Sequence, residues 1–315
     1  MILPCSILPM EPLSAEKVPS GSDYIHSVKW DGVRQLVYLE NKTVRIHNRK
    51  LNDRTQTYPE LHRLNNFITG DGIVIDGEVV AIIDGRASFN RVMKRDFVRT
   101  LETANRLQKT IPITYMAFDL LYYNGESTMD MGLQERLELL TNIVVETNDF
   151  FQITNHIDTG HELFKVTKDL HLEGIVSKHK NSTYKAGKKH MDWFKVKHFR
   201  DLNVVVGGYT YKNNLVNSLS VGAYNDGGLF YLGNAATGLN MDEIKMLTKE
   251  LVKLQRDSSP FTNLKAAKNQ FWVEPKLTLK VSYLEITEEG RLRHPTIEGF
   301  LAISPEDCTL EEAVY

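Results

Sequence analysis

The first part of the chain alternates hydrophobic and polar positions in the manner of short paired strands. Three such segments lie at 24–30, 36–39 and 44–46, and a period of two is typical of half-buried strands. A longer apolar run at 73–83 predicts a buried strand on either side of Asp76-Gly77. The pattern predicts further strands at 113–122, 174–178 and 193–197.

Helical spacing is found between these strands. A short helix is expected after Pro59, and Ser88 can cap a longer helix running towards Leu107. Two more amphipathic helices are predicted at 133–145 and 159–170. Because strands and helices are mixed without a strict βαβ rhythm, we expect an α+β fold rather than a doubly wound α/β fold.

The pattern changes after about Asp201. Short strands separated by Asn and Gly turns are predicted there at 204–209, 219–224 and 229–232, then a helix at 241–254, then strands at 277–286 and 296–303. Five strands with one helix between the third and the fourth suit a small β-barrel such as an OB-fold. We therefore expect two domains, 1–200 and 201–315, joined by a short hinge near 198–203.

The composition is that of an ordinary soluble protein, with 315 residues, 42% hydrophobic and 25% charged. No apolar stretch approaches membrane-spanning length, and the first residues lack the basic start and apolar run of a secretory signal. Cys5 and Cys308, at opposite ends of the chain, suit neither a disulfide framework nor a metal cluster. We expect a cytoplasmic protein with no membrane association.

The net charge of −2 hides an uneven distribution. The segment 178–200 holds eight Lys or Arg residues and one acid, whereas 298–315 holds five acids and no Lys or Arg. The basic segment can therefore bind a polyanion without the whole protein being basic. A solvated, lysine-rich loop explains the same charges, and the sequence leaves both interpretations open.

The segment Lys29-Trp30-Asp31-Gly32-Val33-Arg34 carries the candidate chemistry. It places a lysine amine on a predicted strand, beside a turn and near an arginine suited to phosphate. Such a lysine can attack a nucleoside triphosphate and carry the nucleotide as a phosphoramidate. The alternative is an Asp-Gly hairpin turn with Lys29 and Arg34 as solvated charges.

Lysines and glutamates elsewhere supply what this chemistry needs. Lys195 and Lys197 alternate on one strand face, where they can bind an α-phosphate and favour loss of the proton from Lys29. Glu78 and Glu173 each adjoin a glycine and an apolar run, and one or two carboxylates suit magnesium. The competing interpretations are an edge strand that displays lysines and glutamates in turns at strand ends.

Two further residues have both functional and structural interpretations. Phe118, expected at the end of a strand, can stack on a purine or belong to the core. Arg49 can meet a ribose or a phosphate, or lie on the surface. No G-x-x-x-x-G-K-[ST] loop and no G-x-G-x-x-G is present, so the sequence gives no support to P-loop or Rossmann chemistry.

Taken in order, these motifs resemble those of the covalent nucleotidyltransferases, which are the DNA ligases, RNA ligases and mRNA capping enzymes. The match runs from Lys29–Arg34 through Arg49, 76–78, 118–121 and 173–178 to 193–197. The segments 272–275 and 290–295 look specifically like the ligase domain of bacterial end-joining DNA ligases. The resemblance implies an adenylation domain followed by an OB-fold.

It also implies a role for each matching residue. Lys29 would carry AMP. The others would bind the cofactors, ATP and Mg²⁺ or Mn²⁺: Arg34 and Arg49 at the sugar or phosphates, Glu78 at the ribose or metal, Phe118 against adenine, Glu173 at the metal, and Lys195 and Lys197 at the α-phosphate. AMP would pass to a DNA 5′-phosphate, and a neighbouring 3′-hydroxyl would then seal the nick and release AMP.

The sequence departs from the family pattern at two places. Ser27 stands where the family often has a glutamate two residues before the nucleophile. The segment 299–304 stands where an arginine and a lysine would face the departing pyrophosphate, and Arg291 or Arg293 would have to substitute. We therefore expect a working but slow first step.

The resemblance further implies partners and a setting. We expect nicked duplex DNA as substrate, an end-binding protein and a separate polymerase as partners, and a monomer of bacterial or phage origin associated with the nucleoid. The alternatives are an RNA ligase with the same chemistry and a nick-binding module with impaired self-adenylation. A capping enzyme or an NAD-dependent ligase fits less well. The sequence leaves the pathway open between end joining, repair and mobile-element replication.

Overall fold

The computed structural model describes residues 3–83, 85–264 and 269–312. The chain divides into two compact units, Met1–His198 and Phe199–Tyr315. Each is described by itself. Among the described residues no helix combines the length and the apolar character that crossing a membrane requires.

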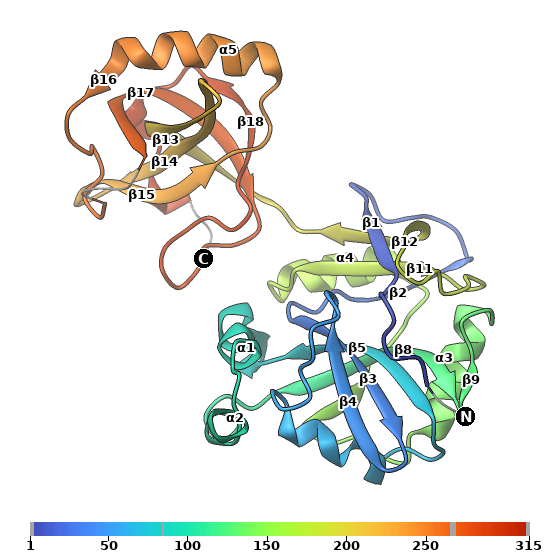
Figure 1. Cartoon of the computed structure of the whole chain (residues 1–315). Helices are drawn as coiled ribbons and strands as arrows, with labels where there is room; N and C mark the ends of the chain where they lie inside the picture. Colours follow the sequence, from blue (N-terminus) through green and yellow to red (C-terminus); the bar gives the residue numbers. More distant parts are fainter. Residues whose placement is uncertain (1–2, 84, 265–268, 313–315) are drawn as a thin grey trace. The chain divides into compact units, whose positions relative to one another are not determined.

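The first unit is built around two mixed sheets (Figure 1). The first sheet has the order β1 (Glu11–Ser14), β12 (Lys189–Lys197), β11 (Gly174–His179) and β2 (Tyr24–Val28). The second has the order β10 (Phe151–Ile153), β8 (Thr114–Tyr123), β5 (Ile73–Val80), β3 (Val33–Glu40) and β4 (Thr43–Asn48), with β9 (Glu126–Ser127) beside β8. A small pair, β6 (Ile82–Ile83) and β7 (Arg86–Ala87), lies apart.

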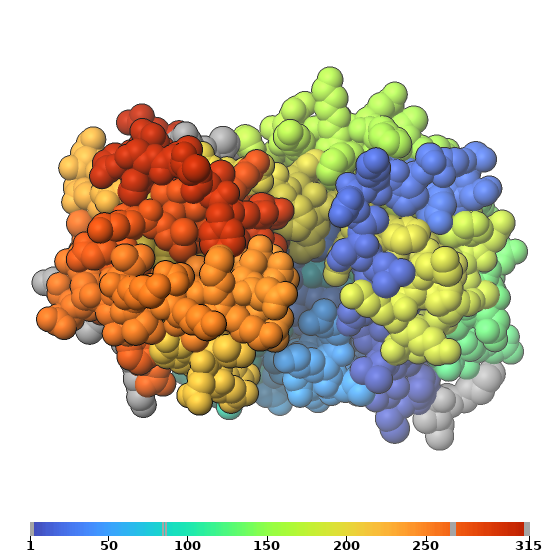
Figure 2. All heavy atoms as spheres, turned by 90° about the horizontal axis from the view of Figure 1, so that it is seen from above, coloured from blue at the N-terminus to red at the C-terminus, as the bar shows by residue number. Residues whose placement is uncertain are grey.

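Within the first sheet, β1 runs parallel to β12, and the other neighbours are antiparallel. Figure 2 shows the consequence on the surface, where blue residues of the N-terminal segment lie beside yellow residues of the β12 region. The first strand of the unit is therefore held by one of its last.

Helices cover the outer faces of the two sheets. They are the 3₁₀ stretch η1 (Pro59–Asn66), α1 (Phe89–Asp96), α2 (Leu101–Leu107), α3 (Leu133–Ile143) and α4 (Gly160–Asp169). Leu163 and Phe164 of α4 pack on Ile175 and Val196 of the first sheet. The largest core, which includes Leu61, Val92 and Leu140, joins the second sheet to η1, α1 and α3.

A third core lies between the two sheets. Leu36 and Val74 come from the second sheet, and Trp193 from the first, with Met10 and Tyr184 beside them. Side chains alternate between the faces of a strand, so residues in step with these point into the space between the sheets. The face of the strand on which a polar residue lies therefore decides whether it points into the space between the sheets.

The segment Lys29–Arg34 crosses from one sheet to the other. β2 pairs with β11 in the first sheet, whereas β3 pairs with β4 and β5 in the second. The Asp31-Gly32 step is therefore not a hairpin turn, and that alternative is wrong. Gly32 is required here because a Cβ on it would lie 2.2 Å from the carbonyl oxygen of Val79.

The second unit is a curled antiparallel sheet with the order β15 (Gly228–Ala235), β14 (Leu215–Asn225), β13 (Arg200–Lys212), β17 (Gln270–Tyr283) and β16 (Gln255–Arg256). The last strand, β18 (Thr296–Leu301), pairs with the far half of β17. Thr237, just after β15, bridges Thr296 and brings the two ends of the sheet together. This is the barrel expected of an OB-fold.

One long helix covers this sheet. α5 (Met241–Glu250) is capped by Asn240 and continues into the 3₁₀ turn η2 (Leu251–Leu254). Two short 3₁₀ turns, η3 (Pro305–Asp307) and η4 (Leu310–Glu312), follow β18. The helix lies between the third and the fourth main strands, as predicted, and the α+β class is confirmed.

Several sequence-based boundaries were wrong for identifiable reasons. The helix expected from Ser88 to Leu107 is two helices, because Thr100 caps a second one through its side chain. The run 73–83 was expected to form strand on either side of Asp76-Gly77, but β5 continues through that step and ends at Val80, before the short β6. β17 begins seven residues earlier than the expected strand at 277–286, because Gln270–Trp272 pair with Gly208–Thr210.

Candidate active site

One wall of the candidate site is a face of the first sheet. The ladder pairs Val176 with both Ser27 and Lys195, and it pairs Lys178 with Trp193. Trp193 points into the space between the sheets, so residues in step with it share that face. They are Ser27, Lys29, Val176, Lys178, Lys195 and Lys197.

The opposite wall belongs to the second sheet. Arg34 is in step with Leu36, and Asp76 and Glu78 are in step with Val74, whose side chains fill the core between the sheets. Arg34 also pairs directly with Glu78 across the β3–β5 ladder. The two walls therefore turn their charged residues towards each other.

Phe118 lies inside β8 at a β-bulge, not at the end of a strand as the sequence suggested. Asp119 pairs with Asp76 and Ala117 with Gly77, so Phe118 is the extra residue between them. A bulge re-aims a side chain and interrupts pairing. It explains why Phe118 stays partly exposed between buried neighbours on both sides.

Glu173 joins two lysines of the first sheet. Lys29 Nζ donates to Glu173 Oε2 at 2.5 Å, and Lys197 Nζ lies 2.7 Å from Oε1. The carboxylate side chain is 7% exposed and each lysine 21%. Each carboxylate oxygen thus has a cationic partner, and the Lys29 amine is fixed while remaining accessible.

Gly174 allows this close approach. Its φ of +144° is a conformation that favours glycine, and a Cβ on it would lie 2.1 Å from the carbonyl oxygen of Val196. The Gly174 carbonyl accepts the backbone N–H of Lys29 at 2.9 Å. The Glu173-Gly174 step therefore brings the strands bearing Lys29 and Lys197 around one carboxylate.

The charges in this group shift two of its pKa values. Burial would raise the pKa of Glu173, but the charges of Lys29 and Lys197 outweigh it and lower that pKa below its ordinary value. Burial, followed by the charges of Lys197 and Lys29, lowers the pKa of Lys195. The site therefore holds an ionised carboxylate among concentrated cations, an arrangement suited to an anionic substrate.

Glu78 lies on the facing wall and is inside β5, not in a turn. Burial raises its pKa to about 8, although the charges of Lys29 and Arg34 act in the opposite direction. Asp76 and Glu173 are close enough to raise that pKa further. A nearby cation would lower it again, because an opposite charge favours the ionised carboxylate.

The donor set suits a magnesium ion that takes most of its ligands from elsewhere. The described residues contain no cluster of three or more His, Cys, Asp or Glu side chains that could hold a metal. Glu78 and Glu173 are two carboxylates that interact electrostatically. Magnesium commonly uses one or two carboxylates together with water and substrate phosphates, so these two residues fit it.

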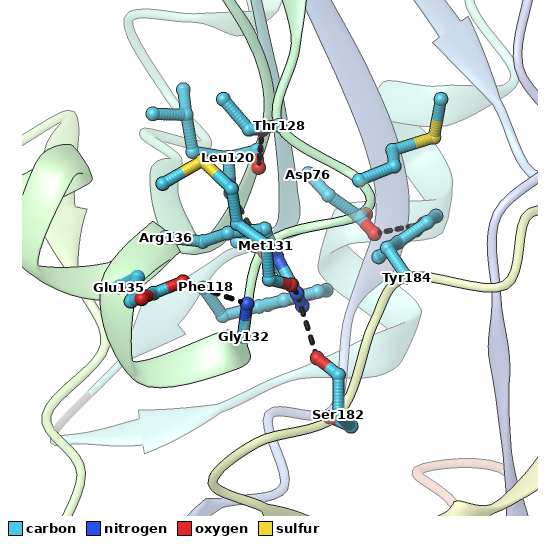
Figure 3. A network of polar contacts seen from close by, with 12 residues as sticks. Asp76, Phe118, Leu120, Thr128, Met131, Gly132, Glu135, Arg136, Ser182 and Tyr184 are labelled. Atoms are coloured by element: carbon cyan, nitrogen blue, oxygen red, sulfur yellow. Dashed lines mark hydrogen bonds and ion pairs between the residues drawn. The ribbon is translucent and has the colours of Figure 1, made fainter.

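Arg34 is held in a bidentate pair with Asp76, which is fully buried. The distances are 2.8 Å from Nε to Oδ1 and 2.5 Å from Nη2 to Oδ2. Tyr184 donates to the same Oδ2 at 2.6 Å, and Figure 3 shows the contact. The Arg34 guanidinium carbon lies 5.2 Å from the centre of the Phe118 ring. Asp76 and Tyr184 thus fix Arg34 beside Phe118.

Lys178 is a buried cation next to the same ring. Its Nζ lies 4.5 Å from the centre of Phe118 and 4.1 Å from that of Trp193, and it donates to the Phe118 carbonyl at 3.1 Å. Burial lowers the pKa of Lys178 to about 8, against the opposite influence of Asp119. The basic segment 178–200 is therefore divided, because Lys178 is 3% exposed and not on its surface.

A second buried ion pair involves Asp119, the residue that follows Phe118 in β8. Arg136 donates to both oxygens of Asp119, at 2.7 and 2.9 Å, and both side chains are fully buried. Arg136 also donates to the carbonyls of Met131 and Ser182, as Figure 3 shows. The bulged strand is thus anchored at Asp119, directly after the aromatic residue.

The structure brings most of the sequence-predicted residues together. Lys29, Glu173 and Lys197 are in direct contact. Burial, followed by the charges of both lysines, lowers the pKa of Lys195. The facing wall carries Glu78, Arg34 and Phe118. Arg49 is different. Its side chain is 58% exposed and forms an ion pair with Glu11 at 3.7 Å.

Sequence reasoning missed Asp76, Tyr184 and Lys178 as site residues. Asp76 and Lys178 were within motifs already recognised, and their polar side chains in apolar runs were a usable signal. Tyr184 gave none. It comes from the loop after β11 and meets Asp76 at a sequence separation of 108.

The two candidate substitutes for a pyrophosphate-facing cation are engaged within the second unit. Arg291 donates to the carbonyl of Tyr231 and lies 4.5 Å above its ring. Arg293 forms an ion pair with Glu285 at 2.9 Å. Both would have to leave these contacts to act elsewhere.

Comparisons with known proteins identify the family to which this sequence and fold are similar. The family model for the ATP dependent DNA ligase domain matches residues 14–197, and that for the ATP dependent DNA ligase C terminal region matches 212–301. The multifunctional non-homologous end joining protein LigD of Mycobacterium bovis is 31% identical over 286 residues, which are 88% of this chain and 36% of that protein. DNA ligase 2 of Methanosarcina mazei is 28% identical over 82% of this chain and 47% of its own length.

Solved structures give the same result. A mycobacterial DNA ligase D complexed with ATP and MES matches with a TM-score of 0.53 and 29% identity, over 96% of this chain and 98% of that one. A Lig E DNA ligase matches with a TM-score of 0.64 over 94% of this chain and 99% of that one. At 18% identity the second likeness shows the fold alone. The chain spans about a third of the length of the mycobacterial LigD proteins.

Proposed function

The chain belongs to the ATP-dependent DNA ligase family, and from this membership we propose that it seals nicks in duplex DNA. The observation that carries the proposal is the contact of one carboxylate, Glu173, with both Lys29 and Lys197. It places a fixed, partly exposed amine among the other lysines of one sheet face, opposite the sheet that carries Phe118. Nucleotide transfer through a lysine needs these features together.

In the first step Lys29 is the nucleophile. Its Nζ loses a proton and attacks the α-phosphorus of ATP, forming a P–N bond. The bond from that phosphorus to the bridging oxygen breaks, and pyrophosphate leaves with the electron pair. Lys195 and Lys197 support this step because cations on the same sheet face offset the charge on the α-phosphate.

The other residues position the nucleotide. Phe118 offers a partly exposed ring for the adenine, and Arg34 is held next to that ring by Asp76. Arg34 and Glu78 then face the sugar and phosphates from the second sheet. Arg49 is exposed, so we assign it to the sugar or phosphates of a substrate that approaches from solvent.

We further propose that Mg²⁺, or Mn²⁺ in its place, is held by Glu78 and Glu173. Bound there with the triphosphate, the ion would neutralise charge on the phosphates. Glu173 would hold the ion beside the Lys29 amine, which it contacts in this structure.

Two transfers would complete the reaction. An oxygen of the DNA 5′-phosphate attacks the lysyl-AMP phosphorus, which breaks the P–N bond and returns the amine to Lys29. The neighbouring 3′-hydroxyl then loses its proton and attacks the activated 5′-phosphate. A phosphodiester bond forms and AMP leaves.

The mycobacterial relatives are named as non-homologous end joining proteins, and this supports a role in end joining. We propose an end-binding protein and a separate polymerase as partners and a monomeric, cytoplasmic enzyme at the bacterial or phage nucleoid. The division into units at residues 198–199 supports an adenylation domain over 1–200 and an OB-fold domain over 201–315.

A sealing assay tests the function. The purified chain is incubated with ATP, Mg²⁺ and a duplex containing one nick with a labelled 5′-phosphate. We expect the label to become resistant to phosphatase and to appear in the full-length strand. The same nick with RNA strands distinguishes the RNA ligase alternative, and binding to the nick without sealing would leave only a nick-binding module.

A further inference from the structure

A buried, unpartnered nitrogen lies in the segment 154–157, between β10 and α4. Nε2 of His156 is buried and has no hydrogen-bond partner among the described residues. Buried polar atoms are nearly always paired, so an exception calls for a ligand or a water molecule. The question is what can reach this atom.

The backbone on each side of His156 fixes its position. Thr154 N–H donates to the carbonyl of Ala117 at 2.7 Å, directly before Phe118. Ile157 and His26 exchange two backbone hydrogen bonds, of 2.8 and 2.9 Å, directly before Ser27. His156 thus lies in a short bridge from the strand of Phe118 to the strand of Lys29.

The surroundings of the imidazole are those of the candidate site. Burial, followed by the charge of Lys178, lowers the pKa of His156 to about 3, although the charge of Asp119 acts in the opposite direction. Lys178 contacts the Phe118 ring, and Asp119 follows Phe118 in the bulged strand. The ring is therefore neutral at physiological pH.

A neutral imidazole has one N–H and one lone pair. A hydrogen bond to the Thr154 backbone raises the pKa of His156, as expected when a ring N–H donates to a carbonyl. Because Nε2 is the nitrogen without a partner, the N–H is assigned to Nδ1. Nε2 then carries the lone pair and can accept a hydrogen bond.

We propose that His156 selects the base of the nucleotide by accepting, through Nε2, a hydrogen bond from the N6 amine of adenine. This inference rests on the proposed function. Adenine carries a donor at N6, whereas guanine presents an acceptor, O6, at the same position. An acceptor at Nε2 therefore favours ATP and opposes GTP, whose oxygen would face a lone pair.

The proposal also accounts for Ser27. This buried serine lies on the face of the first sheet that carries Lys195 and Lys197. Its short hydroxyl cannot reach as far as a glutamate carboxylate would. His156 supplies the acceptor from the adjoining bridge. A neutral acceptor is compatible with burial next to the Lys178 cation.

The test compares three nucleotides and uses the wild-type protein first. Initial rates of covalent labelling are measured with ATP, GTP and purine riboside triphosphate, which lacks the N6 amine. We expect ATP to be preferred over purine riboside triphosphate by about tenfold in rate/KM, as one hydrogen bond would give. Equal rates with these two nucleotides would overturn the inference whether or not any variant folds.

Variants then assign the effect to His156. H156L should bring the ratio of ATP to purine riboside triphosphate close to one, H156Q should restore it through its amide oxygen, and H161L, at an exposed histidine of α4, should leave it unchanged. A wild-type ratio that persists in folded H156L would contradict the assignment. Failure of the wild type to label with ATP would instead refute the proposed function.

Discussion

The Lys29 amine lies 2.5 Å from Oε2 of Glu173, and this one contact ties the nucleophile to the residue proposed to hold the metal. Lys197 occupies the other oxygen. A carboxylate shared by two lysines fixes the amine before substrate arrives.

The first prediction concerns this carboxylate. E173Q keeps the shape of the side chain but removes the charge that holds Lys29 and Lys197, and it weakens the proposed metal site. We expect self-adenylation to fall by about 100-fold or more, the size typical of a lost electrostatic group in an active site. The control is E250Q, at an exposed ion pair with Lys253 in the second unit, which should change the rate little.

A comparison of the wild type with E173Q at different pH values tests the charge of Glu173. The pKa of Glu173 is lowered in the folded protein, so its ion pairs contribute stability above the unfolded pKa of about 4.3. That contribution is lost as the pH falls through the lowered, folded pKa. The stability difference between wild type and E173Q should therefore shrink between pH 7 and pH 3, and a constant difference would refute the charge-based account.

The second prediction concerns Gly174. G174A would place a Cβ 2.1 Å from the Val196 carbonyl oxygen, at a φ of +144°. We expect a loss of about 2 kcal/mol or more in the free energy of unfolding, from strain and displacement of β12. G299A, where a Cβ would meet nothing within 4 Å, should change stability by about 0.5 kcal/mol at most. Urea unfolding measures both, and equal effects would contradict the prediction.

The third prediction separates the two supports of Arg34. D76N leaves a buried guanidinium without its counter-charge, and we expect a loss of about 3–5 kcal/mol in unfolding free energy. Y184F removes the hydrogen bond to the carboxylate and the acceptor of the Met10 backbone N–H and of Arg34, with an expected cost of about 1–3 kcal/mol. Y184F should also raise KM for ATP more than it lowers kcat, because it loosens Arg34 beside Phe118. An unchanged KM in folded Y184F would show that Arg34 needs no such support.

The sequence was most informative where function depends on residues close together along the chain. The segment Lys29–Arg34 and the pair Lys195 and Lys197 were identified from spacing, and the structure places Lys29 and Lys197 on one carboxylate. The α+β class and the barrel of the second unit followed from periodicity. These features are local, so local patterns predict them.

Features that depend on pairing between distant segments were missed. The bulge at Phe118 exists because β8 has one residue more than β5 at that point, and no local pattern shows such a mismatch. Lys29–Arg34 was compatible with a hairpin because a turn does not specify which sheets its flanking strands join. His156 looks like an ordinary loop residue until the hydrogen bonds of Thr154 and Ile157 place it between β8, next to Phe118, and β2.

The fourth prediction follows from the segment 298–315, which has five acids and no Lys or Arg. Arg291 contacts the Tyr231 carbonyl and Arg293 forms an ion pair with Glu285 within the second unit. Neither arginine can bind a departing pyrophosphate without leaving these contacts. We expect a nick that already carries AMP on its 5′-phosphate to be sealed, without ATP, at least about tenfold faster than an ordinary nick with ATP. Equal rates would show that self-adenylation does not limit the reaction.

The most direct test of the central claim is covalent labelling of Lys29. The protein is first treated with pyrophosphate to remove any bound AMP, then incubated with Mg²⁺ and ATP labelled at the α-phosphate, and the labelled peptide is mapped by mass spectrometry. We expect an acid-labile AMP adduct on Lys29 in the wild type and none in folded K29A. A label that persists in K29A, or that maps to another residue, would contradict it.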